Sequence, residues 1–255
     1  MLFSLLILAH VLADFPLQFD KISRQKKNSL LYLLFHVFIY FAVSLLLTLP
    51  YFSPLLLLYL LLLVLIHGLL DMFKIFLEKM VGENYGLEIF LLDQVLHIGI
   101  IAAFIPRLQN FSSPWLLWGF SDMVSSVTSF IGSHYFYNFN FASLILALAV
   151  LIFNFKGGTI FVRNLLRKYK SDIGSQGDKG QAIGNLERLL IIAFVVFGVY
   201  SLIGFMFTAK SLIRFKEVDT HPEKEFIEYY LIGSFSSIFL GFVSGYIIKQ
   251  LLVLV

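Results

Sequence analysis

Long apolar runs separated by short polar segments make up most of the chain. The runs, rich in Leu, Ile and Phe, reach about 20 residues, which is long enough for an α-helix to cross the hydrocarbon core of a bilayer. The pattern predicts an all-α, polytopic membrane helical bundle with about seven transmembrane helices and one interfacial or re-entrant segment. The predicted spans cover residues 2–19, 29–49, 55–79, 87–105, 135–155, 186–209 and 229–253.

The polar segments divide this bundle into four regions. Basic residues, prolines and glycines mark most of the boundaries. The predicted regions are a four-helix module at 1–107, an interfacial segment with one transmembrane helix at 108–155, a polar cytoplasmic linker at 156–185, and a second module of two helices at 186–255. An amphipathic charged stretch at 210–228 joins the last two helices.

Composition supports the membrane class and limits the chemistry. Hydrophobic residues make up 59% of the chain and charged residues 14%, whereas soluble domains carry about 25% charged residues. There is no cysteine, so disulfides, iron–sulfur clusters and thiolate ligands are excluded. The net charge of +3 is scattered, and no nucleic-acid partner is expected. Any metal ion must therefore be held by histidine and carboxylate.

Histidine and aspartate recur four residues apart inside the apolar runs. His67 and Asp71 close the long leucine run, and a helix places two such residues on one face, about 6 Å apart along its axis. The same spacing occurs in two other predicted helices, and a second-helix histidine adds a seventh residue. The further members are His10 and Asp14, Asp93 and His97, and His36.

These seven residues are predicted to lie in the same half of the membrane. Successive helices reverse direction across the bilayer, which places each residue about 6–20 Å from the loops on one side. Those loops, 20–28 and 79–87, carry most of the Lys and Arg of this module, and the opposite loop 50–54 carries none. The positive-inside rule makes the shared side cytoplasmic.

A divalent metal would explain so many ionisable groups in an apolar setting. Each costs at least about 2.5–3.5 kcal/mol to insert, and carboxylate with imidazole suits Zn, Mn or Fe. The number of groups suggests two ions, or one ion with further carboxylates orienting the histidines. The predicted ligands are His10, Asp14, His67, Asp71, Asp93 and His97; the predicted catalytic groups are His36 and Asp14; the predicted substrate contacts are Gln18, Lys74 and Gln94. The alternative is a hydrogen-bonded cluster that only holds the helices together.

The second module offers a weaker candidate. Arg188, Lys210 and Arg214 are predicted to meet an anionic headgroup or substrate. The alternative interpretation is ordinary anchoring of helix ends, with Glu187 and Arg188 forming an ion pair.

These polar positions resemble a known family of bacterial membrane proteins, domain of unknown function 3307. The resemblance rests on Leu8-Ala9-His10-Val11-Leu12-Ala13-Asp14-Phe15-Pro16-Leu17-Gln18, on His36, and on the His67/Asp71 and Asp93/His97 pairs, over about residues 1–105. Residues 184–250 look like the second region of longer members, with Ser234 where a threonine is expected. The resemblance implies a multi-pass protein of the bacterial inner membrane and implies no mechanism.

Three functions compete at this stage. The first is an intramembrane metal-dependent hydrolase whose amphiphilic substrate arrives from the cytoplasmic leaflet. The second is a transporter of divalent metal or protons; cation-diffusion-facilitator exporters are similar in the His/Asp spacing alone. Transport needs access from both sides, and the far half of the four helices, such as 55–65, is expected to offer no polar path. The third is a structural or accessory membrane subunit.

Overall fold

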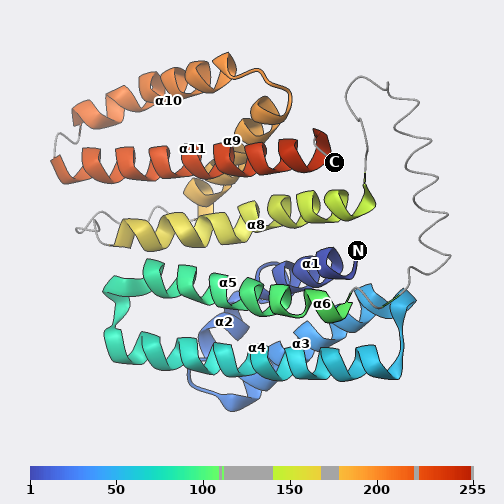
Figure 1. The fold of residues 1–255 in the computed structure, drawn as a ribbon. Helices are drawn as coiled ribbons and strands as arrows, with labels where there is room; N and C mark the ends of the chain where they lie inside the picture. Colours follow the sequence, from blue (N-terminus) through green and yellow to red (C-terminus); the bar gives the residue numbers. More distant parts are fainter. Residues whose placement is uncertain (109–110, 112–139, 168–177, 221–223, 254–255) are drawn as a thin grey trace. The chain divides into compact units, whose positions relative to one another are not determined.

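The described part of the chain is helical throughout. A computed structural model describes residues 1–108, 111, 140–167, 178–220 and 224–253 (Figure 1). Every regular element in these ranges is a helix, which confirms the all-α prediction for them. The interfacial segment predicted after residue 108 lies almost wholly outside the described residues.

Ten α-helices and two short 3-10 helices are described. They are α1 Leu2–Asp14, α2 Asp20–Gln25, α3 Leu30–Thr48, η1 Leu49–Tyr51, α4 Pro54–Val81, η2 Glu83–Tyr85, α5 Gly86–Ala103, α6 Ile105–Leu108, α8 Phe141–Leu166, α9 Asp178–Val196, α10 Ser201–Thr220 and α11 Lys224–Val253.

Five of the described segments are long and apolar enough to cross a membrane. These are Leu30–Tyr51, Pro54–Val81, Gly86–Arg107, Phe141–Leu166 and Ile227–Leu252. They support a membrane protein, as the apolar runs predicted. The number of seven spans is not confirmed.

Two of the predicted spans differ from the helices in the structure. The first helix ends at Asp14 instead of residue 19, so its 13 residues extend only about 20 Å. The predicted helix 186–209 is two helices, α9 and α10. Gly198 separates them with φ 74°, and Val199 N–H donates to the Phe194 carbonyl at 2.8 Å. This left-handed glycine with its i to i−5 bond is the usual helix-ending Schellman motif.

The described parts of the predicted linker 156–185 are mostly helical. α8, which is long and apolar enough to cross a membrane, continues to Leu166, and α9 begins at Asp178, so the polar residues near these ends belong to helices instead of a loop. Charged residues occur both in loops and in the last turns of helices. Hydropathy therefore ended the predicted 135–155 helix earlier than the structure does. Similarly, the stretch 210–228 divides between the end of α10 and the start of α11.

The chain forms two compact units, each described by itself. The first contains residues 1–152 with 251–255, and the second contains 153–250. In the first unit α3 packs against α1 and α4, and α4 lies beside α5 in the antiparallel direction (Figure 1). α4 begins where Ser53 Oγ accepts a hydrogen bond from Leu56 N–H at 3.1 Å, with Pro54 as the first helical residue.

α1 is the most enclosed helix of the first unit, although it is short. All of its residues except Phe3, Ile7 and Leu12 are buried. It packs against α3, α5 and α6, and its small residues Ala9 and Ala13 share a cluster with Tyr40 of α3. Close packing at alanine lets a polar helix face sit inside the bundle.

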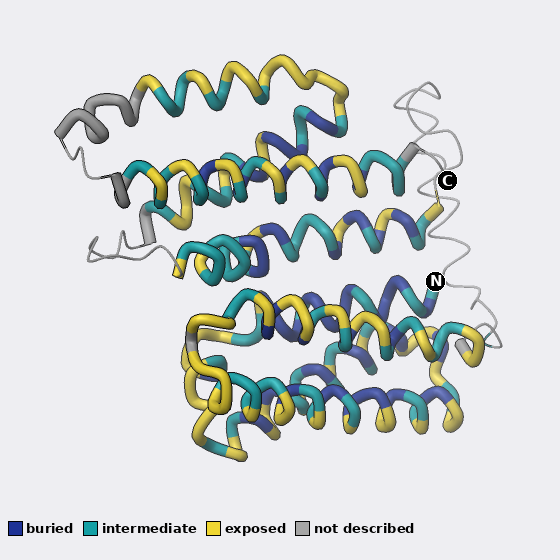
Figure 2. Tube along the Cα trace, turned by 60° about the vertical axis from the view of Figure 1, so that its left-hand side comes forward, coloured by how far each residue is buried: buried dark blue, intermediate teal, exposed yellow. Residues whose placement is uncertain are grey.

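The helices of the first unit carry apolar residues outside and polar residues inside. Along α3, α4 and α5 buried positions recur with exposed ones between them, so each of these helices has an enclosed and an open face (Figure 2). The open faces of α3, α4 and α5 carry exposed side chains such as Leu31, Leu65 and Val95, as expected of a lipid-facing surface. The enclosed face of α3 carries Leu33 followed by four polar residues: His36, Tyr40, Ser44 and Thr48.

The second unit depends on a close approach of α9 and α11 at Gly245. A Cβ atom there would lie 2.8 Å from Val195 Cβ and 3.1 Å from the Ile192 backbone. We expect Gly245→Ala to destabilise the protein by about 1–3 kcal/mol through overpacking. Thermal unfolding in detergent measures the effect. The matched control is Gly204→Ala, since that position has no atom within 4 Å; an equal loss in both variants would contradict the packing argument.

Candidate metal centre

Seven histidines and aspartates from four helices converge inside the first unit. Every one of them is buried, with exposed fractions between 0% and 7%. α1 supplies two, α3 one, α4 two and α5 two. The set, here called the His/Asp cluster, is His10, Asp14, His36, His67, Asp71, Asp93 and His97.

For three of the four helices the shortest side-chain contacts in the cluster run between helices; the exception is the pair in α5, where His97 Nδ1 lies 3.4 Å from Asp93 Oδ1. His36 Nε2 lies 3.2 Å from His67 Nε2, 3.2 Å from Asp71 Oδ2 and 3.4 Å from Asp14 Oδ1. His67 Nε2 lies 3.6 Å from Asp14 Oδ1. Within the pairs, the separations are 3.8 Å for His10–Asp14 and 3.9 Å for His67–Asp71.

Three of these atoms, His36 Nε2, His67 Nε2 and Asp71 Oδ2, lie close enough together to share one metal ion, and Asp14 Oδ1 lies near both nitrogen atoms. Tetrahedral zinc with bonds of about 2.0–2.1 Å separates its ligand atoms by about 3.3–3.4 Å. Each of the two Nε2 atoms lies 3.2–3.9 Å from the other and from both carboxylate oxygens. Three sets of side chains could each hold an ion geometrically: His10, Asp14 and His67; His36, His67 and Asp71; and Asp71, Asp93 and His97.

Lys26 is a member of the site that the sequence reasoning missed. Its Nζ lies 3.0 Å from both carboxylate oxygens of Asp71, and both side chains are almost fully buried. In the sequence Lys26 stands in a run with Lys21, Arg24 and Lys27, and nothing distinguishes it from loop residues that mark the cytoplasmic side. The short helix α2 turns this one lysine inward.

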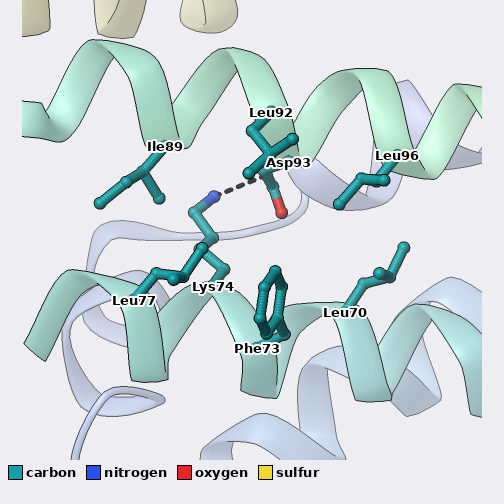
Figure 3. Close-up of a pocket in the computed structure, with 8 residues that line it drawn as sticks. All are labelled: Leu70, Phe73, Lys74, Leu77, Ile89, Leu92, Asp93 and Leu96. Atoms are coloured by element: carbon teal, nitrogen blue, oxygen red, sulfur yellow. Dashed lines mark hydrogen bonds and ion pairs between the residues drawn. The ribbon is translucent and has the colours of Figure 1, made fainter. Parts of the chain in front are cut away.

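Lys74 has a similar role toward Asp93. Its Nζ donates to Asp93 Oδ2 at 2.7 Å, and the Gln94 side-chain amide donates to the same oxygen at 3.0 Å. The ion pair lies in a small pocket between α4 and α5, whose other walls are apolar (Figure 3). The remaining lining residues are Leu70, Phe73, Leu77, Ile89, Leu92 and Leu96. Lys74 and Gln94, predicted as substrate contacts, thus also bind a predicted metal ligand.

Hydrogen bonds fix the tautomers of two histidines and leave one lone pair on each. His97 Nδ1 donates to the Asp93 carbonyl at 2.8 Å, which leaves Nε2 as an acceptor. His10 Nε2 donates to Gln94 Oε1 at 3.4 Å, which leaves Nδ1 as an acceptor. His97 Nε2 and His10 Nδ1 are both buried and have no hydrogen-bond partner within the described part of the chain. Such lone pairs favour a cation or a proton nearby.

The charges of the cluster leave Asp14 without a lysine. Lys26 pairs with Asp71 and Lys74 pairs with Asp93, so with neutral histidines the cluster carries one net negative charge. Asp14 Oδ1 instead faces three imidazoles, those of His10, His36 and His67. A buried carboxylate without a cation is costly. One imidazolium would neutralise the cluster, and one divalent ion would compensate the charge of Asp14 and leave a net charge of +1.

The remaining predicted substrate contacts lie elsewhere. Gln18 is partly buried in the turn between α1 and α2. Arg188 and Lys210 belong to the second unit, and the side chain of Arg214 lies outside the described part. Glu187 forms an ion pair with Lys210 at 2.7 Å. 

Arg188 is buried instead of anchoring a helix end at the membrane surface. Its guanidinium donates to the Asn154 carbonyl at 3.1 Å, to Ser237 Oγ at 3.2 Å and to Thr159 Oγ1 at 2.8 Å, and it also bonds Asn185. With these donors occupied, the side chain joins α8, α9 and α11.

The half of the first unit that lies farther from the basic loops 20–28 and 79–87 is more polar than the sequence suggested. The expectation of no polar path is correct for α4, whose buried positions there include Leu56, Leu60 and Leu63. It is wrong for α3, since Tyr40, Ser44 and Thr48 are 1–2% exposed. Single hydroxyls among leucines did not stand out in the sequence, but their four-residue spacing from His36 places them on one helix face.

Comparison with known families places the cluster in a recognised context. Residues 2–125 match the family described as "Protein of unknown function (DUF3307)". This region of the chain belongs to that family, as the spaced polar residues indicated. The DUF3307 region contains α1 to α6 and therefore every residue of the His/Asp cluster. Comparisons with curated proteins and with solved structures find no significant match.

The buried Lys26–Asp71 ion pair predicts a stability difference between neighbouring lysines. Lys26→Met leaves the Asp71 carboxylate buried without its cation and should cost about 3–5 kcal/mol. Lys27→Met is the matched control, because the Lys27–Glu78 pair is partly exposed (49% and 27%) and should be worth about 0–1 kcal/mol. Thermal unfolding of metal-free protein in detergent measures both. Equal stability of the two variants would contradict the arrangement.

Proposed function

We propose that the His/Asp cluster binds a divalent metal ion and that the protein is a metal-dependent membrane hydrolase. The observation that carries the proposal is the spacing of His36 Nε2, His67 Nε2 and Asp71 Oδ2, with Asp14 Oδ1 beside them. Catalytic zinc sites use three protein ligands and keep a fourth position open, and this arrangement supplies that number.

The roles of the residues follow from their charges and contacts. We assign His36, His67 and Asp71 as ligands and Asp14 as the base, because Asp14 is the carboxylate without a lysine. A bound divalent ion would supply Lewis acidity for the hydrolysis of an ester. Asp14 would accept a proton as the general base, with the His10 imidazole beside it, since His10 Nδ1 lies 3.8 Å from Asp14 Oδ1. Asp93 and His97 support a second ion or orient the first set.

The surroundings of the Lys74–Asp93 pair support an amphiphilic substrate. Apolar side chains of α4 and α5 surround the pair, and Phe73 and Leu92 among them are exposed (Figure 3). Lys74 carries the positive charge that an anionic headgroup needs, and its partner Asp93 belongs to the cluster. We place the protein in the bacterial inner membrane with the cluster toward the cytoplasmic leaflet, on the evidence of the basic loops.

Metal content of detergent-purified protein tests the site directly. Inductively coupled plasma mass spectrometry should find about one equivalent of Zn, Mn or Fe in the wild type, since one ion needs three or four of these ligands. His67→Ala and Asp71→Asn should lose it. The control is Asp20→Asn, which changes an exposed carboxylate in α2. Metal retained by all variants, or absent from folded wild type purified with metal, would reject the metal site.

Lipid hydrolysis tests the enzymatic role. Metal-loaded protein incubated with bilayer lipids and single-chain esters or phosphoesters should release product, and Asp14→Asn should lower the rate by about 10²–10⁴-fold, the contribution of a general base. Mass spectrometry of the lipids gives the readout. If metal-loaded wild type releases no product from any amphiphile while vesicles containing it take up zinc, the hydrolase assignment fails and transport replaces it.

Transport of divalent metal or protons is the second candidate function. One observation favours the movement of protons: the buried face of α3 carries polar side chains from His36 to Thr48.

A further inference from the structure

The buried face of α3 carries a row of hydroxyl groups leading away from the His/Asp cluster. Tyr40, Ser44 and Thr48, here called the hydroxyl row, follow His36 at intervals of four residues. They are 2%, 1% and 1% exposed. At the rise of an α-helix, Thr48 lies about 18 Å beyond His36 along the axis, more than half the thickness of the hydrocarbon core.

Both ends of the hydroxyl row have polar neighbours. At the cluster end the Tyr40 ring stacks on the His67 ring with centroids 4.2 Å apart, and His36 lies one turn away. At the other end Thr48 is followed by the short helix η1, which contains the buried Tyr51 and leads to the connection with α4. The row thus connects the cluster with the membrane surface opposite the basic loops.

One member of the row has an unsatisfied hydroxyl. Hydroxyls in membrane helices usually donate to the carbonyl four residues earlier, and Thr48 does so to Ser44 at 2.7 Å. Ser44 Oγ is fully buried and has no hydrogen-bond partner among the described residues. Leaving a buried hydroxyl unpaired costs about 1–3 kcal/mol, and a bound water removes that cost.

The members of the row follow one another closely enough for a chain of hydrogen bonds. The Tyr40 hydroxyl lies beside Ser44 Oγ. Ser44 and Thr48 lie one turn apart, about 6 Å along the helix axis, and two O–H···O hydrogen bonds through one water cover about 5.6 Å. Ser44 is the middle member of the row, with Tyr40 on one side and Thr48 on the other.

We propose that the hydroxyl row conducts protons between the His/Asp cluster and the opposite membrane surface. Each hydroxyl or water accepts a proton on one oxygen lone pair and releases its own proton to the next oxygen, so one proton crosses and no group is consumed.

The same geometry excludes a metal ion from this path. The row supplies oxygen atoms from one helix only, and the buried face of α4, which packs against α3, carries Leu56, Leu60 and Leu63. A divalent ion needs six or more oxygen ligands, or four in a fixed shell, and leucine supplies none. Protons alone therefore use the row. The inference goes beyond the proposed function and does not require bound metal.

Proton flux in reconstituted vesicles tests the proposal. The protein is placed in vesicles of phosphatidylethanolamine and phosphatidylglycerol with a trapped pH-sensitive dye, and a potassium gradient with valinomycin drives protons, with and without a zinc gradient. We expect wild-type flux above that of empty vesicles and a loss of about tenfold or more in Ser44→Val, equivalent to a single barrier increase of about 1.4 kcal/mol. Thr48→Val, which keeps the shape of the side chain, is the second variant in case Ser44→Val does not fold.

The matched control is Ser4→Val, a buried serine of α1 that lies outside the row. Flux that is lost in Ser44→Val or Thr48→Val and retained in Ser4→Val supports the proposal. Absence of wild-type flux under both conditions overturns it, as does equal flux in all four proteins. Metal content of the same samples separates the two ideas: flux without metal rejects the metal site alone, and metal without flux rejects the proton path alone.

Discussion

The neutralisation of three buried carboxylates is the constraint on which the first unit depends. Asp14, Asp71 and Asp93 lie almost fully buried in helices whose outer faces are apolar, where an unpaired charge costs several kcal/mol. Lys26 and Lys74 neutralise two of them. Asp14 remains, surrounded by imidazoles that can bind a metal ion or a proton. The chemistry proposed for the protein is a consequence of this remaining charge.

The same constraint explains the unusual position of α1. A helix of 13 residues is too short to span the hydrocarbon core, yet it is the most enclosed helix of the unit. It carries His10 and Asp14, so exposing it to lipid would expose them too. Ala9 and Ala13 allow the α3 backbone to come close, and Tyr40 fills the remaining space against His67. Both the polar interior and the apolar exterior of the unit thus follow from the lipid that surrounds it.

Much of the arrangement could be predicted from the spacing of polar residues in apolar runs. The helices α3, α4 and α5 were predicted within a few residues, because hydropathy reports length and lipid contact directly. Helix ends in the second unit were predicted poorly, since Lys and Arg occur both in loops and in the last turns of helices. Gly198 ends α9 inside an apolar run, and hydropathy does not register a change of backbone conformation.

By itself the sequence determined the helical class, the membrane setting, the family and the seven-residue His/Asp cluster, because four-residue spacing and helix reversal follow from backbone geometry alone. Only the tertiary structure decided which charges meet. Lys26 is one of four basic residues in a short run, and in the structure it is Lys26 at the end of α2 that forms the ion pair with Asp71. In the sequence Ser44 is a single hydroxyl residue among leucines. In the structure α1 and α4 pack against α3, which carries it. Such contacts depend on the rotation of each helix about its axis relative to its neighbours. The pattern of polar residues along the sequence does not specify that rotation.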